Sequence, residues 1–230
     1  MTVTIDELAV ADEASAWERL GFAVEGDTCV MGEVRIRLVG RDGGKGLVGW
    51  SLRGLEADGE QRDSAAEIDL DGLPTSLSDR EVPRGRPVHA RGVIEHATHP
   101  NGITALDHVV AISSDLDRTV AALQAAGLDL RRVREEPTPA GAPRQAFFRL
   151  GAEILEVVQA PPEAIERTGG DKPAFLWGLA FVAPDLDATV AKLGEHVSEV
   201  RDAVQPGRSI ATLRRSAGLA LPIALMTPAA

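Results

Sequence analysis

The stretch DLDRTVAAL, Asp115–Leu123, returns as DLDATVAKL, Asp185–Leu193, with seven of nine letters identical. In both copies the second, sixth and ninth letters are apolar, which is the i, i+4, i+7 spacing of one helix stripe. We expect Ser114 to cap the first helix and Gly127 to stop it. Gly194 is the expected stop of the second. The sequence therefore predicts two copies of one amphipathic helix.

Strand-like segments surround each copy of this helix. Before the two helices, ALDHVVAIS and FLWGLAFVA align at a constant offset of 70, which sets His108 opposite Gly178. After each helix come two further segments with β-forming composition. These are RQAFFRL (144–150) and AEILEVVQA (152–160) in the first copy, and RSIATLRR (208–215) and LALPIALM (219–226) in the second. Each unit reads as a strand, a helix and two or three strands.

A weaker third copy begins the chain. In VTIDELAVA (3–11), Asp6 matches Asp107 and Glu7 matches His108. A short helix and three strands are expected to follow, up to residue 56. The turn GRDGGKG (40–46) lacks the Ser or Thr that a phosphate loop needs after its Lys, so we expect a hairpin turn at Asp42-Gly43 and no nucleotide.

The expected organisation is α+β. We expect a degenerate N-terminal βαβββ module at 1–56 and an irregular connector at 57–104, with one strand near ARGVIEHAT. Complete modules should follow at 105–160 and 175–228. The connector is rich in Gly, Pro, Asp and Arg, which suits irregular structure.

Composition narrows the function classes. The chain has 230 residues, a formal net charge of −11 and only 3% aromatic residues, so neither nucleic acid nor an anionic membrane is an expected partner. Cys29 is the only cysteine, which excludes an intramolecular disulfide. The first residues lack the pattern of a signal peptide, and we expect a cytoplasmic protein.

The segments ALDHVVAISSDLDRTVAALQAAGLDL and RQAFFRLGAEILEVVQAP together resemble one module of the glyoxalase, bleomycin-resistance and extradiol-dioxygenase group, the vicinal-oxygen-chelate superfamily. The resemblance covers 105–228 well and 1–56 loosely. It implies that modules pair into curved mixed sheets that enclose a cleft, with helices outside. It also implies a small-molecule ligand and a divalent metal held by His or Gln on first strands and Glu on last strands.

Carried onto this sequence, the resemblance makes His108 and Glu156 metal ligands for Fe, Mn, Ni or Zn, with Glu7 a third ligand or a general base beside a catalytic His108. Strand alternation places Glu156 among apolar neighbours, where its charge needs either a metal or an Arg, for which Arg144 or Arg149 could serve. The module at 175–228 has Gly178 at the position that matches His108, and its last strand contains no acidic residue. Which modules pair is left open, and a homodimer could complete the unit left over.

Other candidate residues follow from position. Arg144, Phe148 and Trp177 are the expected substrate-binding residues. His96 and His99 have the spacing HxxH, but the following Pro-Asn-Gly favours a loop, so we expect a turn-stabilising or solvent-facing role ahead of metal binding.

Two functions are consistent with these residues. The first is a metal-dependent lyase, isomerase or ring-cleaving dioxygenase that acts on vicinal oxygens. The second is a metal-free protein that binds and sequesters a small molecule, as bleomycin-resistance proteins do. A surface without any pocket is a third alternative, because fold alone does not fix function.

Overall fold

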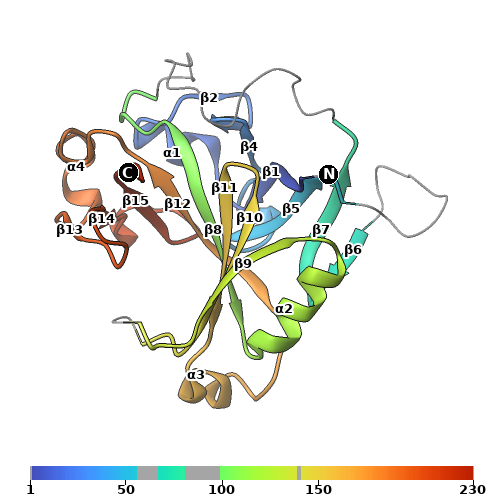
Figure 1. Cartoon of the computed structure of the whole chain (residues 1–230). Helices are drawn as coiled ribbons and strands as arrows, with labels where there is room; N and C mark the ends of the chain where they lie inside the picture. The colour runs from blue at the N-terminus through green and yellow to red at the C-terminus, as the bar shows by residue number, and fades with distance from the viewer. Residues whose placement is uncertain (1, 56–66, 81–98, 139–140, 230) are drawn as a thin grey trace. The chain divides into compact units, whose positions relative to one another are not determined.

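The structure, a computed structural model, describes residues 2–55, 67–80, 99–138 and 141–229. Its helices are α1 (Ala14–Arg19), α2 (Leu116–Ala125), α3 (Pro162–Arg167) and α4 (Leu186–Leu193). Its strands are β1 (Thr4–Val10), β2 (Val24–Glu25), β3 (Thr28–Met31), β4 (Val34–Leu38), β5 (Leu47–Arg53), β6 (Glu67–Leu70), β7 (Leu73–Ser78), β8 (Ala105–Ser113), β9 (Asp129–Arg134), β10 (Gln145–Leu150), β11 (Glu153–Gln159), β12 (Phe175–Val182), β13 (Arg201–Asp202), β14 (Ser209–Thr212) and β15 (Ile223–Met226). The expected α+β class is confirmed (Figure 1).

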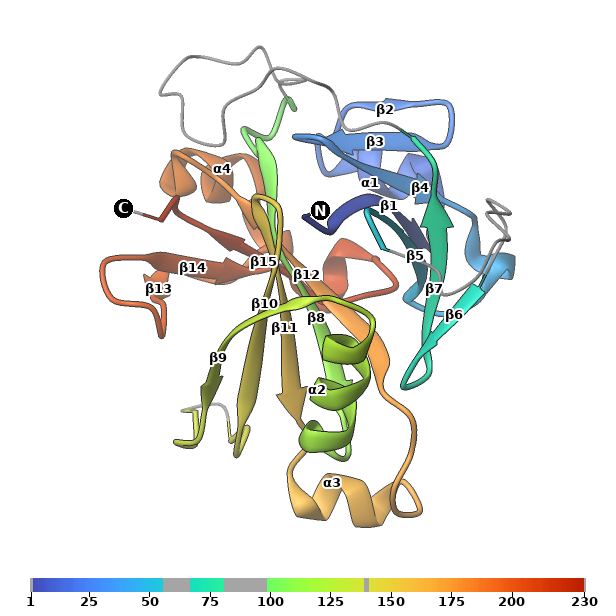
Figure 2. The ribbon, with the colours of Figure 1, turned by 45° about the vertical axis from the view of Figure 1, so that its right-hand side comes forward.

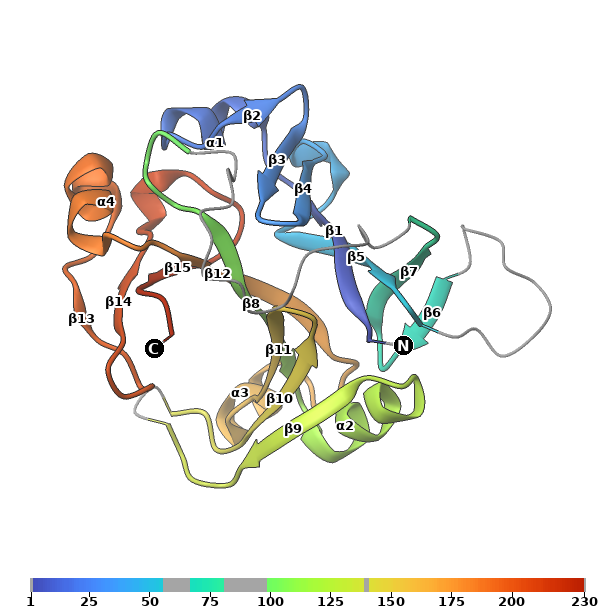
Figure 3. The ribbon, with the colours of Figure 1, turned by 45° about the horizontal axis from the view of Figure 1, so that its top comes forward.

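The strands form two mixed sheets. One has the order β2-β3-β4-β1-β5-β7-β6, which can be followed in Figure 3, and the other has the order β13-β14-β15-β12-β8-β11-β10-β9. In the second sheet the first strands of the two complete modules, β8 and β12, are neighbours. Strands of the segments 105–160 and 175–228 therefore lie in one sheet.

One strand pattern recurs in both sheets. The first strand of a module pairs in parallel with its last strand, as β1 does with β4 and β12 with β15. The last strand pairs in antiparallel fashion with the one before it, as β4 does with β3 and β15 with β14. β5, β7 and β6 repeat this pattern, with β5 parallel to β7 and β7 antiparallel to β6. They form a shortened module without a helix of its own.

Part of the segment expected to be an irregular connector is thus ordered as β6 and β7. The two strands are joined by Asp71-Gly72, both of which have positive φ (57° and 85°). Such a pair makes the turn whose twist suits a two-residue hairpin, and Asp-Gly is a favoured sequence for it. The strand expected near ARGVIEHAT, at residues 90–98, and the histidine at 96 lie outside the described residues.

Two local expectations need correction. The N-cap of α2 is Asp115, one residue after Ser114, and its carboxylate accepts a hydrogen bond from the backbone N–H of Arg118 at 3.1 Å. Asp185 caps α4 in the same way. The turn at Asp42-Gly43 is not a hairpin, because β4 and β5 lie on opposite sides of β1. The helix stops at Gly127 and Gly194 lie where expected, both with positive φ.

The described residues divide into two compact units. The first contains residues from 1–6, 49–90 and 109–177, and the second contains residues from 7–48, 91–108 and 178–230. In the first, α2 lies along one face of β9, β10 and β11 (Figure 2) and buries Leu116, Thr119 and Leu123. In the second, an aromatic cluster of Trp17, Phe22 and Phe181 forms part of the core.

Candidate functional site

The imidazole of His108 is held by its neighbour in sequence. Its Nδ1 lies 2.7 Å from Oδ2 of Asp107, and both side chains are 14% exposed. An ionised carboxylate has only acceptor atoms, so Nδ1 carries the proton and donates it. In the neutral ring Nε2 is then the nitrogen without a proton. This tautomer is the one suited to accept a proton or bind a metal through Nε2.

Asp107 is in turn held by a buried arginine. Nη2 of Arg208 donates to Oδ1 of Asp107 at 2.5 Å, and Nη1 lies 3.3 Å from Oδ2. The guanidinium is itself fixed by the Thr227 carbonyl, at 2.7 Å from Nε, and by the Gln205 side chain, at 2.7 Å from Nη1. The guanidinium is therefore anchored before it orients the carboxylate.

The charge state of Asp107 follows from these partners. Burial acts to raise the pKa of its carboxyl, but hydrogen bonds from His108 and Arg208 outweigh burial and lower the pKa below its usual 3.8. Asp107 is therefore ionised near neutral pH, which supports its role as the acceptor for Nδ1–H of His108.

Glu7 lies at the matching place on β1, but its carboxylate is bound differently. It contacts Arg37 at 2.7 Å and Arg35 at 3.2 Å, both on β4. β1 and β4 pair in parallel, and the register places Glu7 beside Arg35. Two guanidinium groups already bind this carboxylate, so it is poorly placed to bind a cation as well.

Glu156 lies on a half-exposed face of the first unit. In the β10–β11 register, Gln145, Phe147 and Arg149 stand opposite Val158, Glu156 and Ile154, and all six are half-exposed. We call these six residues the open face. Gln145 donates a hydrogen bond from its side-chain amide to Glu156.

The opposite face of β10 and β11 packs against α2 and is buried. Phe148, an expected substrate-binding residue, is 0% exposed on that face together with Leu155 and Val157. Its neighbour Phe147 is the phenylalanine that shares a face with Glu156. The prediction was one residue out of phase, and one residue inverts the face of a strand.

Trp177 and Arg144 were also expected to bind substrate. Trp177 is 44% exposed, and strand alternation places it on the face of β12 opposite to Gly178. Arg144 is committed to two carboxylates, with contacts of 2.7 Å to Glu135 and 3.0 Å to Asp117. Among the described residues, no hydrogen bond or ion pair joins Arg144 to Glu156.

His99 has a structural role. It is 1% exposed, accepts the backbone N–H of Ala23 on Nδ1 at 2.9 Å, and donates from Nε2 to the Val30 carbonyl at 3.0 Å. His99 therefore joins segments far apart in the chain, and the solvent-facing alternative is wrong because the ring is buried. Cys29 is buried, which raises the pKa of its thiol to about 12 and leaves it unreactive.

Comparison with known proteins reports similarity of fold. No family model and no curated protein matches the sequence. Among solved structures, a xylose isomerase-like TIM barrel/4-hydroxyphenylpyruvate dioxygenase fusion protein matches 100% of this chain with 49% of its own, at 14% identity and TM-score 0.62. The chain thus spans about half of that protein. It has the fold of the vicinal-oxygen-chelate superfamily.

Two methylmalonyl-CoA epimerases match part of this chain. The Mycobacterium tuberculosis enzyme matches 61% of the chain with 95% of its own, at 19% identity and TM-score 0.47. A Streptomyces coelicolor variant in complex with 2-nitronate-propionyl-CoA matches 56% with 96%, at 24% identity and TM-score 0.46. No helix among the described residues is long and apolar enough to cross a membrane.

The vicinal-oxygen-chelate fold implies a divalent metal, and the donor atoms test that implication. Among the described residues there is no group of three His, Cys, Asp or Glu side chains that could hold a metal ion. Glu7 does not fit, because Arg35 and Arg37 already bind its carboxylate. His108 fits, since a metal-binding imidazole typically donates its other nitrogen to a carboxylate. Glu156, the other expected ligand, lies in the first compact unit, whereas His108 lies in the second.

Asp107 and Arg208 are the functional candidates that sequence reasoning missed. Asp107 stands directly before His108, which is a signal that could have been noticed. Arg208 is 101 positions away in the chain, and no local pattern links it to Asp107. β12 pairs in parallel with β15, and β15 pairs in antiparallel fashion with β14. This strand order alone brings the region of Arg208 into the sheet that contains β8.

Proposed function

We propose that this protein is a glyoxalase-like enzyme for a small oxygen-containing molecule, and that His108 transfers a proton next to a carbonyl group, as isomerases and lyases do. The observation that carries the proposal is the Asp107–His108 pair, anchored by Arg208. It fixes the imidazole in one tautomer and stabilises the imidazolium that forms when Nε2 takes a proton.

A divalent ion, where bound through His108, would polarise the substrate oxygens as a Lewis acid. His108 would then be a ligand and not the base. The two alternatives differ in a measurable way: elemental analysis of the purified protein should find a near-stoichiometric metal in the second case, and His108→Gln should release it.

Proton transfer is tested without knowledge of the natural substrate. Wild-type protein should accelerate exchange of C–H protons with deuterium in D2O for at least one member of a panel of 2-oxo acids, 1,3-dicarbonyls and thioesters, followed by NMR. His108→Gln should slow that exchange by roughly 100-fold or more. His196→Gln, a histidine of the same unit outside the pair, should retain it. Equal exchange by His108→Gln and wild type would refute the proposal.

The second candidate is a metal-free binding protein of the bleomycin-resistance type. It would account for the sequence of the last module, where Gly178 stands at the position of His108 and Ile223–Met226 contains no acid. Thermal-shift screening separates it from the enzyme: organic ligands should stabilise the protein, and the D2O experiment should then show no exchange for any compound.

A further inference from the structure

The open face of the first unit carries a second chemical feature, on the side toward β9. In the β9–β10 register, Arg132 stands opposite Phe147, and Arg134 stands opposite Gln145. Arg149 lies on the same face two residues from Phe147. Paired residues on antiparallel strands share a face, and diagonal neighbours are within reach of long side chains. Arginines therefore occupy positions next to one half-exposed phenylalanine on the same face.

Arg149 differs from the other arginines in its environment. Within the described part of the chain, every other buried or half-buried arginine has a carboxylate within 4.0 Å; these are Arg35, Arg53, Arg118, Arg134, Arg144 and Arg208. No carboxylate contact is recorded for Arg149, which is half-buried on β10. A partly desolvated guanidinium is stabilised by an anion, and none of the described residues supplies one to Arg149.

The acids nearby do not fill this role. Asp129 stands opposite Arg149 in register, but its carboxylate is bound by Arg131 at 3.1 Å. Glu156 accepts the amide of Gln145. Glu136 lies 3.9 Å from Arg134 and is 76% exposed. The local charge is therefore positive, although the whole chain carries −11.

We propose that Arg149, together with Arg132, binds the carboxylate of a small organic ligand whose apolar part packs on Phe147. A planar guanidinium matches the two oxygens of a carboxylate with parallel hydrogen bonds, and a phenyl ring offers an apolar surface beside them. This inference goes beyond the proposed function, because it assigns a ligand class to the first unit and does not depend on proton transfer.

The test measures binding of benzoate by calorimetry and by backbone amide NMR shifts on β9 and β10. Benzoate should bind more tightly than benzamide, its neutral analogue, by at least tenfold. Arg149→Gln should weaken benzoate binding tenfold or more, and Arg149→Lys should weaken it less because the charge remains. Arg167→Gln is the matched control: it removes the same charge from α3, where Arg167 is exposed, and should retain wild-type affinity.

Three outcomes would overturn the inference: equal binding of benzoate and benzamide, undiminished binding by a folded Arg149→Gln protein, or equal losses in Arg149→Gln and Arg167→Gln. Inorganic phosphate is a separate arm, and phosphate binding tighter than benzoate would overturn the assignment to carboxylates. The thermal unfolding midpoint of each variant verifies that it is folded. Because the readout is binding without turnover, failure here and failure of the proton-transfer proposal can be told apart.

Discussion

His108 and Asp107 are adjacent in sequence and bonded through their side chains, with Nδ1 of the imidazole 2.7 Å from Oδ2 of the carboxylate. The matching aspartate of β1, Asp6, is also bound by a buried arginine, Arg53, which is 8% exposed. The first-strand aspartate thus anchors an arginine in both sheets. What differs is the residue after it, which is a histidine in β8 and an arginine-bound glutamate, Glu7, in β1.

Breaking the Asp107–Arg208 pair should destabilise the fold. Asp107→Asn leaves the guanidinium, which is 7% exposed, without its counter-ion, and we expect the free energy of unfolding to fall by about 3 kcal/mol. Urea unfolding measures this. Arg208→Met and the double variant complete a cycle, in which the double variant should lose less than the sum of the two single losses. The exposed Asp202→Asn serves as the control, and additive losses would show that the pair is not coupled.

The two phenylalanines of β10 should respond very differently to truncation. Phe148→Ala removes a fully buried ring beneath α2 and should cost about 3–5 kcal/mol of unfolding free energy. Phe147→Ala removes a half-exposed ring from the open face and should cost about 1 kcal/mol. Chemical denaturation of both variants decides this, and comparable losses would contradict the assignment of faces.

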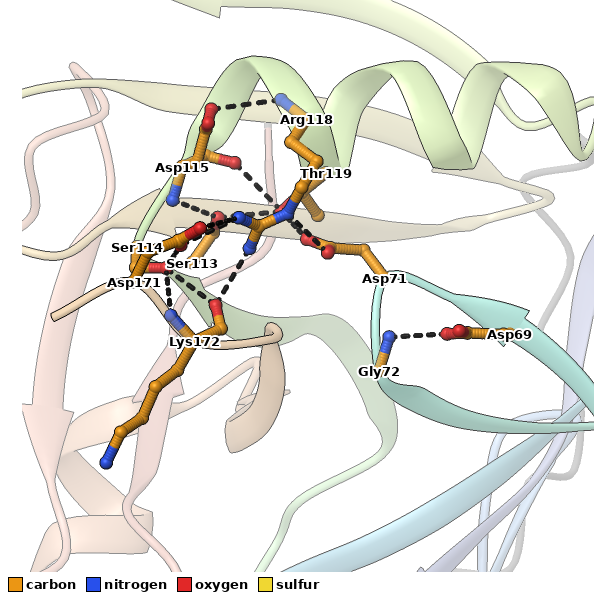
Figure 4. Close-up of polar contacts among 10 residues, drawn as sticks. All are labelled: Asp69, Asp71, Gly72, Ser113, Ser114, Asp115, Arg118, Thr119, Asp171 and Lys172. Atoms are coloured by element: carbon orange, nitrogen blue, oxygen red, sulfur yellow. Dashed lines mark hydrogen bonds and ion pairs between the residues drawn. The ribbon is translucent and has the colours of Figure 1, made fainter. Parts of the chain in front are cut away.

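The hairpin between β6 and β7 is tied to the start of α2 by one aspartate (Figure 4). Asp71 accepts a hydrogen bond from Nε of Arg118 at 2.6 Å and another from the hydroxyl of Thr119. Asp71→Asn keeps a residue that tolerates the left-handed backbone but removes the charge. We expect it to lower the free energy of unfolding by about 1–3 kcal/mol.

Asp171 is the matched control for that change. It also binds Arg118, through Nη1 at 2.5 Å, but its side chain is 65% exposed against 8% for Asp71. Solvent screens an exposed ion pair, so Asp171→Asn should change stability much less than Asp71→Asn in the same urea titration. The opposite ranking would show that exposure does not determine the strength of these two contacts.

The buried imidazole of His99 should make stability depend on pH. Burial lowers the pKa of His99 below its usual 6.5, whereas the unfolded chain retains that value. Between the two values the unfolded state binds more protons than the folded state. The contribution of the neutral His99 ring to stability is therefore fully present above pH 7 and is lost as the pH decreases toward 5. His99→Gln should reduce the difference in unfolding free energy between pH 7 and pH 5. His196→Gln is the comparison, and an unchanged difference in His99→Gln would exclude this role.

Gly178 should resist conversion into a second metal-binding or catalytic position. A Cβ atom there would lie 2.8 Å from the carbonyl oxygen of Pro222, closer than real contacts allow. Gly178→Ala should therefore cost about 1–3 kcal/mol through overpacking. At Gly49 the equivalent atom would lie 3.2 Å from the Pro74 carbonyl oxygen, and Gly49→Ala should cost less. Thermal unfolding compares the two, and a neutral Gly178→Ala would contradict the steric argument.

Local patterns in the sequence predicted the repeated helices, their glycine stops and the first strands, because these depend on side chains three, four or two positions apart. The resemblance of one module to a known fold then predicted paired mixed sheets correctly. The phase of β10 was misjudged because Phe147 and Phe148 are both apolar. With identical residues at consecutive positions, composition cannot say which one faces α2.

The sequence by itself determined the α+β class, the duplicated strand–helix units and the histidine that follows Asp107. Only the tertiary structure decided that β5, β6 and β7 form a shortened module and that Arg208 binds Asp107. It also decided that arginines bind the Glu7 carboxylate, whereas no carboxylate of the described residues binds Arg149. The physical reason is that ion pairs join residues far apart in the chain. Their partners are chosen by strand order and register, which no local spacing encodes.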